Sequence, residues 1–280
     1  MKSNYRYIVK AFMAMAVIAG TTSCDDFLDR EPMSSISPET YYSTAAQLEA
    51  NLNDEYPNVL PSFGQWTYGI FGEDKGTDNQ IEVNANDRYT QDRWKVPHSE
   101  SDNWKFERIY RINFFLSEAL PKFGEDMSGS QNTISGSVAT IKHYIGEMYF
   151  LRAYEYFKKL QLFGDFPIIN QPLADEMEAL REASKRFPRN EVARFIISDL
   201  DKAYAYMSDV DMATTRINKD VAMLVKSRVA LFEATWLQNF KGTAFVPGGE
   251  GWPGASLHNN YQYPSGNIDN EVKYFLEQAV

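Results

Sequence analysis

Cysteine is nearly absent from this chain of 280 residues, and histidine and long apolar runs are scarce as well. Its one cysteine, Cys24, leaves no pair for an internal disulfide and no cluster for a thiolate metal site. The three histidines, His98, His143 and His258, lie far apart and form no HExxH pair, so the sequence indicates no metal and no cofactor. The apolar run Ala11–Gly20 is shorter than the ~20 residues that cross a bilayer, and no later segment is apolar enough to do so.

Positive charge is also in short supply, with 28 Lys and Arg against 38 Asp and Glu. The formal net charge is −10, and it becomes −13 once the three basic residues near the start, Lys2, Arg6 and Lys10, are removed with a leader. Because nucleic-acid binding depends on neutralising phosphates, no nucleic-acid partner is expected. Hydrophobic residues make up 44% of the chain, which is enough for a packed core.

The first residues have the order of a secretory signal: basic, then apolar over Ala11–Gly20, then small over Thr21–Ser23. With Cys24 directly after them, they resemble a bacterial lipoprotein signal, in which the cysteine is acylated and becomes the first mature residue. Thr21 departs from that pattern, which usually has an aliphatic residue there. An ordinary cleaved signal with an odd cysteine is the alternative. Lipidation at Cys24 predicts a protein anchored to a membrane without spanning it.

Beyond a polar tether with two prolines, apolar residues recur at helical spacing and no convincing strand alternation appears. We therefore expect a signal peptide at 1–23, a tether at 24–38 and one helical domain at 39–280. Its expected helices cover 38–56, 101–123, 137–162, 190–207, 218–240 and a last one beginning near residue 270. The fold class is mostly α, with pairs of antiparallel helices.

Several boundaries carry specific signals. Pro57 and Pro61 are expected to end the first helix, and Trp104 to lie on the apolar stripe of the second, in the core. Asn218 is expected to cap the helix that follows it. The last helix has no visible cap or stop, so we expect the natural protein to continue beyond Val280.

A family resemblance covers nearly the whole chain. The segment Cys24–Asp29 with Pro32 looks like the mature start of SusD/RagB-like lipoproteins of Bacteroidota. Further similarities to that family run through four later stretches: Trp104 to Asn113, Leu151 to Pro167, Arg189 to Asp201, and Lys219 to Leu231.

The resemblance implies a fold of tetratricopeptide-like helix pairs with long irregular loops that carry the ligand site. It implies a non-catalytic lipoprotein on the outer face of the outer membrane, which binds an oligo- or polysaccharide and delivers it to a TonB-dependent, SusC-like transporter. Members of the family are normally longer than this chain.

Two loops combine flat aromatic rings with hydrogen-bonding groups, as sugar binding requires. The glycan-binding candidates in them are Trp66, Asp78, Asn79, Trp94, Trp252 and Tyr261. Structural pinning of the loops by these aromatic residues is the alternative role. At the level of function, the alternatives are a lipid-anchored glycoside hydrolase and a helical-repeat scaffold for protein interactions.

Overall fold

The structure is a computed structural model, in which Tyr42 to Val280 form one unit by their contacts. The described residues are 41–61, 79–80, 103–124, 126–208, 212–213 and 215–280. The predictions for Cys24, Trp66, Asp78 and Trp94, and the signal peptide and tether, lie outside them.

Helices supply the regular structure of the described residues, apart from one 3-10 turn and isolated bridges such as Thr44 with Ser135 and Phe166 with Phe187. The expected mostly-α class is confirmed. The helices are α4 (Ala45–Val59), α5 (Glu107–Phe123), α6 (Val138–Phe163), α7 (Met177–Ala183), α8 (Arg189–Tyr206), α9 (Lys219–Asn239) and α10 (Ile268–Ala279), and the 3-10 turn is η3 (Pro253–Ser256).

Polar caps start the main helices where the sequence suggests. Ser137 and Asn218 accept a hydrogen bond from a first-turn amide of α6 and α9. These caps satisfy backbone donors that the helix itself leaves free. Gly164 closes α6 with φ of 67°, a backbone conformation that glycine adopts without strain. The predicted bounds of α6, α8 and α9 are confirmed within one residue.

The first expected helix differs from prediction at both ends. α4 begins at Ala45, because Thr44 and Gln47 form a reciprocal capping box there. Pro57 does not end the helix, which continues to Val59. Pro57 removes one backbone hydrogen bond of the last turn, and the helix continues for two residues beyond it.

Trp104 is not on a helix. It lies in the turn before α5, where it is half-buried, and its ring packs edge-on against Phe163 and Phe166 at 4.9 and 5.0 Å between centroids. The prediction of a helix at Trp104 was wrong, because the spacing of Trp104 from the apolar residues of α5 matches a helical period by coincidence. Packing against the rings of Phe163 and Phe166 holds the tryptophan instead.

The last helix does have a cap, contrary to expectation. Asn267 accepts from the amide of Asn270, so α10 starts two residues before the predicted position. The short helix α7 was not predicted at all. It has no buried residue, so it shows no apolar period that a sequence pattern could detect.

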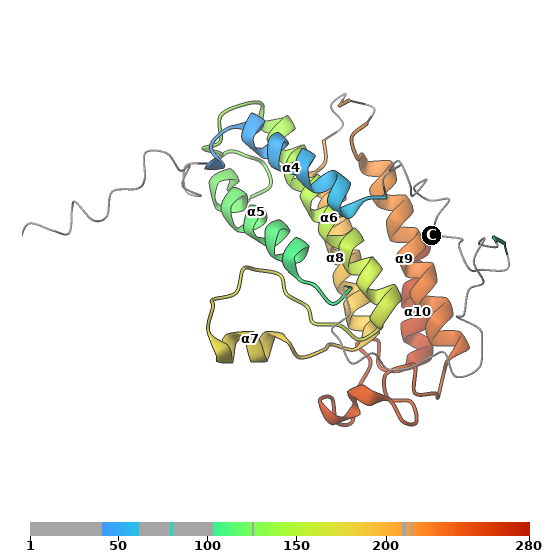
Figure 1. Cartoon of the computed structure of the whole chain (residues 1–280). Coiled ribbons are helices and arrows are strands. Elements are labelled where there is room, and N and C mark those ends of the chain that lie inside the picture. The colour runs from blue at the N-terminus through green and yellow to red at the C-terminus, as the bar shows by residue number, and fades with distance from the viewer. Residues whose placement is uncertain (1–40, 62–78, 81–102, 125, 209–211, 214) are drawn as a thin grey trace, which may run out of the picture. The chain divides into compact units, whose positions relative to one another are not determined.

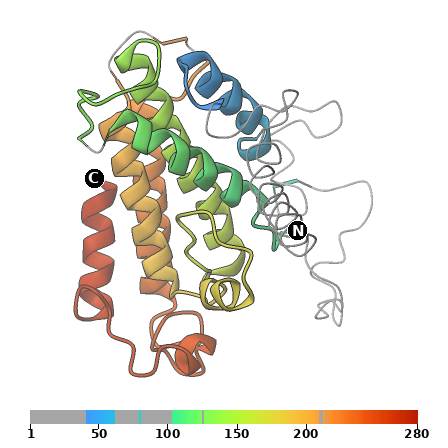
Figure 2. The same ribbon diagram turned by 90° about the vertical axis from the view of Figure 1, so that its left-hand side faces the viewer.

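Packing runs from one helix to the next. α6 packs against α4, α5 and α8; α8 packs against α9, and α9 against α10 (Figures 1 and 2). Gly146 allows the close approach of α6 and α8, since a Cβ there would lie 2.8 Å from the amide nitrogen of Met207. Among the described helices, none is long and apolar enough to span a membrane.

Buried arginine–carboxylate pairs join these helices. Each carboxylate is fully buried and accepts from the arginine through two nitrogens, which is the strong fork geometry of guanidinium and carboxylate. The three pairs are Arg152–Asp199 between α6 and α8, Arg189–Glu233 between α8 and α9, and Arg194–Glu271 between α8 and α10.

Candidate functional site

An open pocket of about 470 Å³ lies at one end of the helix array. The last turn of α6, the first residue of α8, the last turns of α9 and the segment after α9 meet there. Figure 1 shows that segment in orange and red at the same end as the C-terminal ends of α6 and α9. Because α6, α8 and α9 run antiparallel to one another in turn, the end of α6, the start of α8 and the end of α9 lie at the same end of the helix array.

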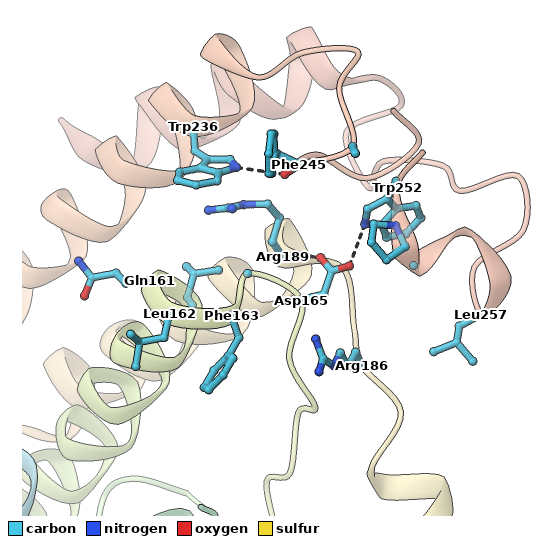
Figure 3. A pocket seen from close by; sticks show the side chains of 15 residues that line it. Gln161, Leu162, Phe163, Asp165, Arg186, Arg189, Trp236, Phe245, Trp252 and Leu257 are labelled. Carbon is cyan, nitrogen blue, oxygen red and sulfur yellow. Dashed lines mark hydrogen bonds between the residues drawn. The ribbon is translucent and has the colours of Figure 1, made fainter. Parts of the chain in front are cut away.

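Aromatic rings form one wall of the pocket (Figure 3). Trp236 is half-buried and its Nε1–H donates to the carbonyl of Phe245 at 3.1 Å. The ring of Phe245 is 61% exposed, and Phe240 lies between the two with centroids 4.6 and 5.4 Å away. An exposed ring that is fixed from behind offers a flat face for stacking at low entropic cost.

Arg189 lies beneath this wall. Its guanidinium carbon is 4.0 Å from the centroid of the Trp236 ring, a cation–π contact, and the side chain is only 3% exposed. Its Nε and Nη2 donate to the carboxylate of Glu233. Burial raises the pKa of the Glu233 carboxyl above its usual range, and the charge of Arg189 partly offsets that effect. The remaining nitrogen, Nη1, lies beside Gly164 on the pocket lining.

Asp165 supplies the carboxylate of the pocket. One oxygen accepts from the backbone N–H of Arg189 at 2.9 Å and the other from Nε1–H of Trp252 at 2.8 Å. Burial raises the pKa of the Asp165 carboxyl, and these two hydrogen bonds partly oppose the rise. Because Arg189 begins α8, the carboxylate also sits at the positive end of that helix.

Arg186 flanks the pocket on the other side of Asp165. Its backbone is fixed, since its carbonyl accepts from Nε2 of His258 and the neighbouring Phe187 forms a bridge with Phe166. Its guanidinium is exposed and lies over the ring of Trp104, 4.6 Å from the centroid.

Two of the predicted glycan-binding residues belong to this region. Trp252 lines the pocket, but it is 5% exposed and tied to Asp165. Tyr261 does not line the pocket; its hydroxyl donates to Asn190, and its ring packs on Trp252 at 5.6 Å. Both rings therefore pin the segment after α9 to the helices. Asn79 is not among the pocket-lining residues.

The sequence pattern missed Trp236, Phe245, Arg186 and Arg189 as site residues. Arg189 had appeared only as part of a family match, and Trp236 only as a helical residue. The signal that could have found Arg189 is its position at the start of a helix rich in apolar residues. An arginine buried there needs a charged or polar partner. Within the described part of the chain, no cluster of three His, Cys, Asp or Glu could hold a metal ion.

The fold and the pocket define a class: a protein of packed helices with an open, aromatic-walled pocket at one end. A family model of SusD-like proteins, described as starch-binding and associating with the outer membrane, matches residues 26–231. The chain belongs to this SusD-like family.

Curated relatives come from Formosa agariphila. SusD-like protein P2 is 25% identical over 253 residues, which are 86% of this chain and 46% of the relative. SusD-like protein P25 is 25% identical over 233 residues, 76% of this chain and 41% of the relative. The chain thus spans less than half the length of these relatives.

Solved structures show the same fold. A SusD-like protein from Bacteroides fragilis superposes with a TM-score of 0.52 at 21% identity, over 76% of this chain and 39% of that protein. The expected tetratricopeptide-like helical architecture is confirmed by this likeness.

Proposed function

We propose that this chain is the binding part of a lipid-anchored protein on the outer face of the outer membrane. It captures an extracellular oligo- or polysaccharide and delivers it to a TonB-dependent, SusC-like transporter. The anchor is the acylated Cys24, and the protein carries out no chemistry on its ligand.

The pocket between α6, α8 and α9 carries the proposal. Phe245 presents an exposed ring, and Arg189, Arg186 and Asp165 supply polar groups within the same 470 Å³ space. Sugars combine apolar C–H faces with hydroxyls, and a ring beside polar side chains matches both features. Membership of a family described as starch-binding supports the same function.

A binding role fits the polar groups of the pocket better than hydrolysis. Glycosidases use two carboxyl groups about 5 to 10 Å apart. Among the described residues that line this pocket, Asp165 is the one carboxylate, and both its oxygens accept hydrogen bonds from the protein.

Titration calorimetry of the mature protein against a panel of poly- and oligosaccharides tests the binding role. We expect modest affinity for at least one glycan and about a fivefold loss in the Phe245→Ala variant, because a stacking contact is worth about 1 kcal/mol. Tyr204→Ala is the matched control: Tyr204 is an exposed ring on α8 outside the pocket, and its removal should leave affinity unchanged. No heat with any glycan, or an equal loss in both variants, would count against the proposal.

Membrane attachment has its own test. Metabolic labelling with palmitate should mark the wild-type protein and leave Cys24→Ser unlabelled and released from the membrane fraction. Co-purification of a TonB-dependent barrel from detergent-solubilised cells would support the delivery step.

A further inference from the structure

Part of the pocket wall is a loop, residues 242–252, which carries both Phe245 and Trp252 and is called the wall loop below. Resting on the function proposed above, we propose that Asp165 is the positioning residue of this loop. Its ionised carboxylate holds the indole of Trp252, and through it the wall loop, in the conformation that binds the glycan. Glycan affinity therefore falls when Asp165 takes up a proton.

The wall loop is one closed piece of backbone. The amide of Glu250 donates to the carbonyl of Gly242 at 3.2 Å across its base, and the amide of Trp252 donates to the carbonyl of Gly249 at 3.2 Å. A Cβ at Gly249 would overlap a backbone oxygen of the same loop, so the turn is tight at this point. Because the loop is closed in this way, a shift of Trp252 is passed on to the exposed ring of Phe245.

Side-chain hydrogen bonds tie the wall loop to its surroundings, and they differ in their acceptors. Nε1–H of Trp236 donates to the carbonyl of Phe245 at 3.1 Å, and the hydroxyl of Tyr263 donates to another carbonyl of the loop at 2.7 Å. Nε1–H of Trp252 donates instead to Oδ2 of Asp165 at 2.8 Å (Figure 3). Backbone carbonyls do not titrate in water, so the bond to Asp165 is the one of these three whose acceptor a proton can change.

The geometry around Asp165 suits a carboxylate and not a neutral carboxyl. Oδ1 accepts from the backbone N–H of Arg189 at 2.9 Å, and Oδ2 accepts from Trp252. Both neighbours are donors, and a neutral carboxyl has an O–H of its own, so it no longer accepts on both oxygens with the strength of a carboxylate. The N–H of Arg189 is fixed at the start of α8, whereas Trp252 lies in a loop. The bond to Trp252 is therefore the one that weakens.

Charged and titratable groups surround Asp165 from α8, α9 and the segments before α8 and after α9. Burial raises the pKa of the Asp165 carboxyl above the ordinary 3.8, while its two hydrogen bonds and two nearby guanidinium groups limit the rise. Asp165 thus takes up a proton at a higher pH than an ordinary aspartate, and the ionised form is lost as the pH falls through that raised pKa. The surrounding groups are Arg186, Arg189, Glu233, His258 and Tyr263.

Two of these groups need separate attention in a pH experiment. The pKa of the Glu233 carboxyl is also raised by burial, so a pH profile of the wild type alone does not identify Asp165. Nε2 of His258 faces a carbonyl, that of Arg186, and therefore carries a proton in both charge states of the ring, so this bond persists when the histidine titrates. Substitutions of Asp165 and of its donor Trp252 identify the group.

Hydrogen exchange on the ligand-free mature protein tests whether Asp165 holds the wall loop. Asp165→Asn replaces the carboxylate by a neutral amide, and Trp252→Phe removes the indole N–H and keeps an aromatic ring. At about pH 7 the amides of the wall loop should exchange about tenfold faster in both variants than in the wild type, because a charge-assisted hydrogen bond is lost. Asp201→Asn, an exposed aspartate on α8 outside the pocket, is the control. Unchanged exchange in Trp252→Phe would overturn the positioning role.

Calorimetry with maltohexaose and laminarihexaose tests the effect on binding, because neither probe has a titratable group in this range. Wild-type affinity should fall about tenfold between about pH 8 and about pH 4. Asp165→Asn and Trp252→Phe should bind about tenfold more weakly than the wild type at about pH 7, with little further loss at lower pH. Trp236→Phe removes a tie to a backbone carbonyl, so it should bind more weakly and keep the pH dependence of the wild type. Circular dichroism verifies that each variant is folded.

The outcomes separate this inference from the proposed function. Wild-type affinity and pH dependence in Asp165→Asn or in Trp252→Phe would overturn the role of Asp165 and leave glycan binding intact. A loss in Asp165→Asn with none in Trp252→Phe would mean that Asp165 contacts the glycan directly, which also overturns the positioning role. Absence of binding to every glycan of the panel would overturn the proposed function, whereas the exchange experiment decides on the wall loop without a ligand.

Discussion

Two buried arginine forks of nearly the same geometry lie on the two sides of α8, and they differ in what remains free. Arg152, on α6, donates to Asp199 through Nε and Nη2, and its Nη1 donates to Asn113 and to the carbonyl of Asn170. Arg189 donates to Glu233 through the same two nitrogens but leaves Nη1 at the pocket.

The comparison separates a structural charge from a site charge. Both arginines are 3% exposed, and both carboxylates are fully buried. Each pair therefore incurs a desolvation cost and recovers it through hydrogen bonds. Complete satisfaction of Arg152 leaves nothing for a ligand, whereas partial satisfaction of Arg189 leaves one donor directed at a space that a ligand can enter.

The largest expected effect follows from breaking the structural fork. Arg152→Met should lower the free energy of unfolding by about 3 to 5 kcal/mol, because Asp199 stays buried without its main partner. Urea denaturation followed by circular dichroism measures this loss. Lys241→Met, which removes an exposed ion pair with Asp269, is the control and should cost at most about 1 kcal/mol. A loss for Arg152→Met no larger than that of the control would show that the fork is not a major stabilising element.

Much of the fold is readable from local signals. Ser137 and Asn218 mark helix starts because a cap needs only its own side chain and the next turn. The position of Trp104 and the helix α7 could not be predicted from local signals, for physical reasons. The first packs through rings contributed by distant segments, and the second buries nothing that could impose a period.

The pocket is less readable than the helices. Trp252 was singled out from an aromatic, glycine-rich segment and does line the pocket. Arg189 and Trp236 meet only because α8 and α9 pack side by side, and no sequence spacing encodes their 4.0 Å contact. Whether an aromatic ring pins a loop or faces a ligand depends on burial, which the sequence of one loop does not contain.

The third fork, Arg194 with Glu271, makes a contribution to stability that should depend on pH. Burial alone would raise the pKa of the Glu271 carboxyl, but hydrogen bonds from Arg194, Asn190 and Ser265 outweigh it and hold that pKa below the ordinary 4.5. A lowered folded-state pKa contributes stability above the ordinary value, and this contribution is lost as pH falls through the folded-state pKa. Glu271→Gln should therefore cost about 2 kcal/mol near pH 7, since charge-assisted hydrogen bonds are lost.

Unfolding measured over a series of pH values checks the predicted direction of this pH dependence. The difference in unfolding free energy between wild type and Glu271→Gln should shrink as the pH is lowered below about 4.5, because the wild-type carboxyl becomes neutral too. Glu277→Gln, on the exposed face of α10, is the control and should cost little stability near pH 7, because its ion pair with Lys273 is exposed. A gap between wild type and Glu271→Gln that stays constant down to about pH 3 would contradict the lowered pKa.

The smallest expected effect in energy comes from double substitutions that replace each fork by apolar residues. These variants are the most direct test of the comparison between the two forks. In Arg152→Met/Asp199→Leu and Arg189→Met/Glu233→Leu neither partner is left as a lone buried charge, so both variants should recover most of the stability that a single substitution loses. If the two forks differ as argued, glycan affinity falls about tenfold in the second variant and stays unchanged in the first. Calorimetry on folded protein, verified by circular dichroism, measures both. Equal affinities in the two double variants would mean that Nη1 of Arg189 is as structural as the nitrogens of Arg152, and the distinction between the two forks would be lost.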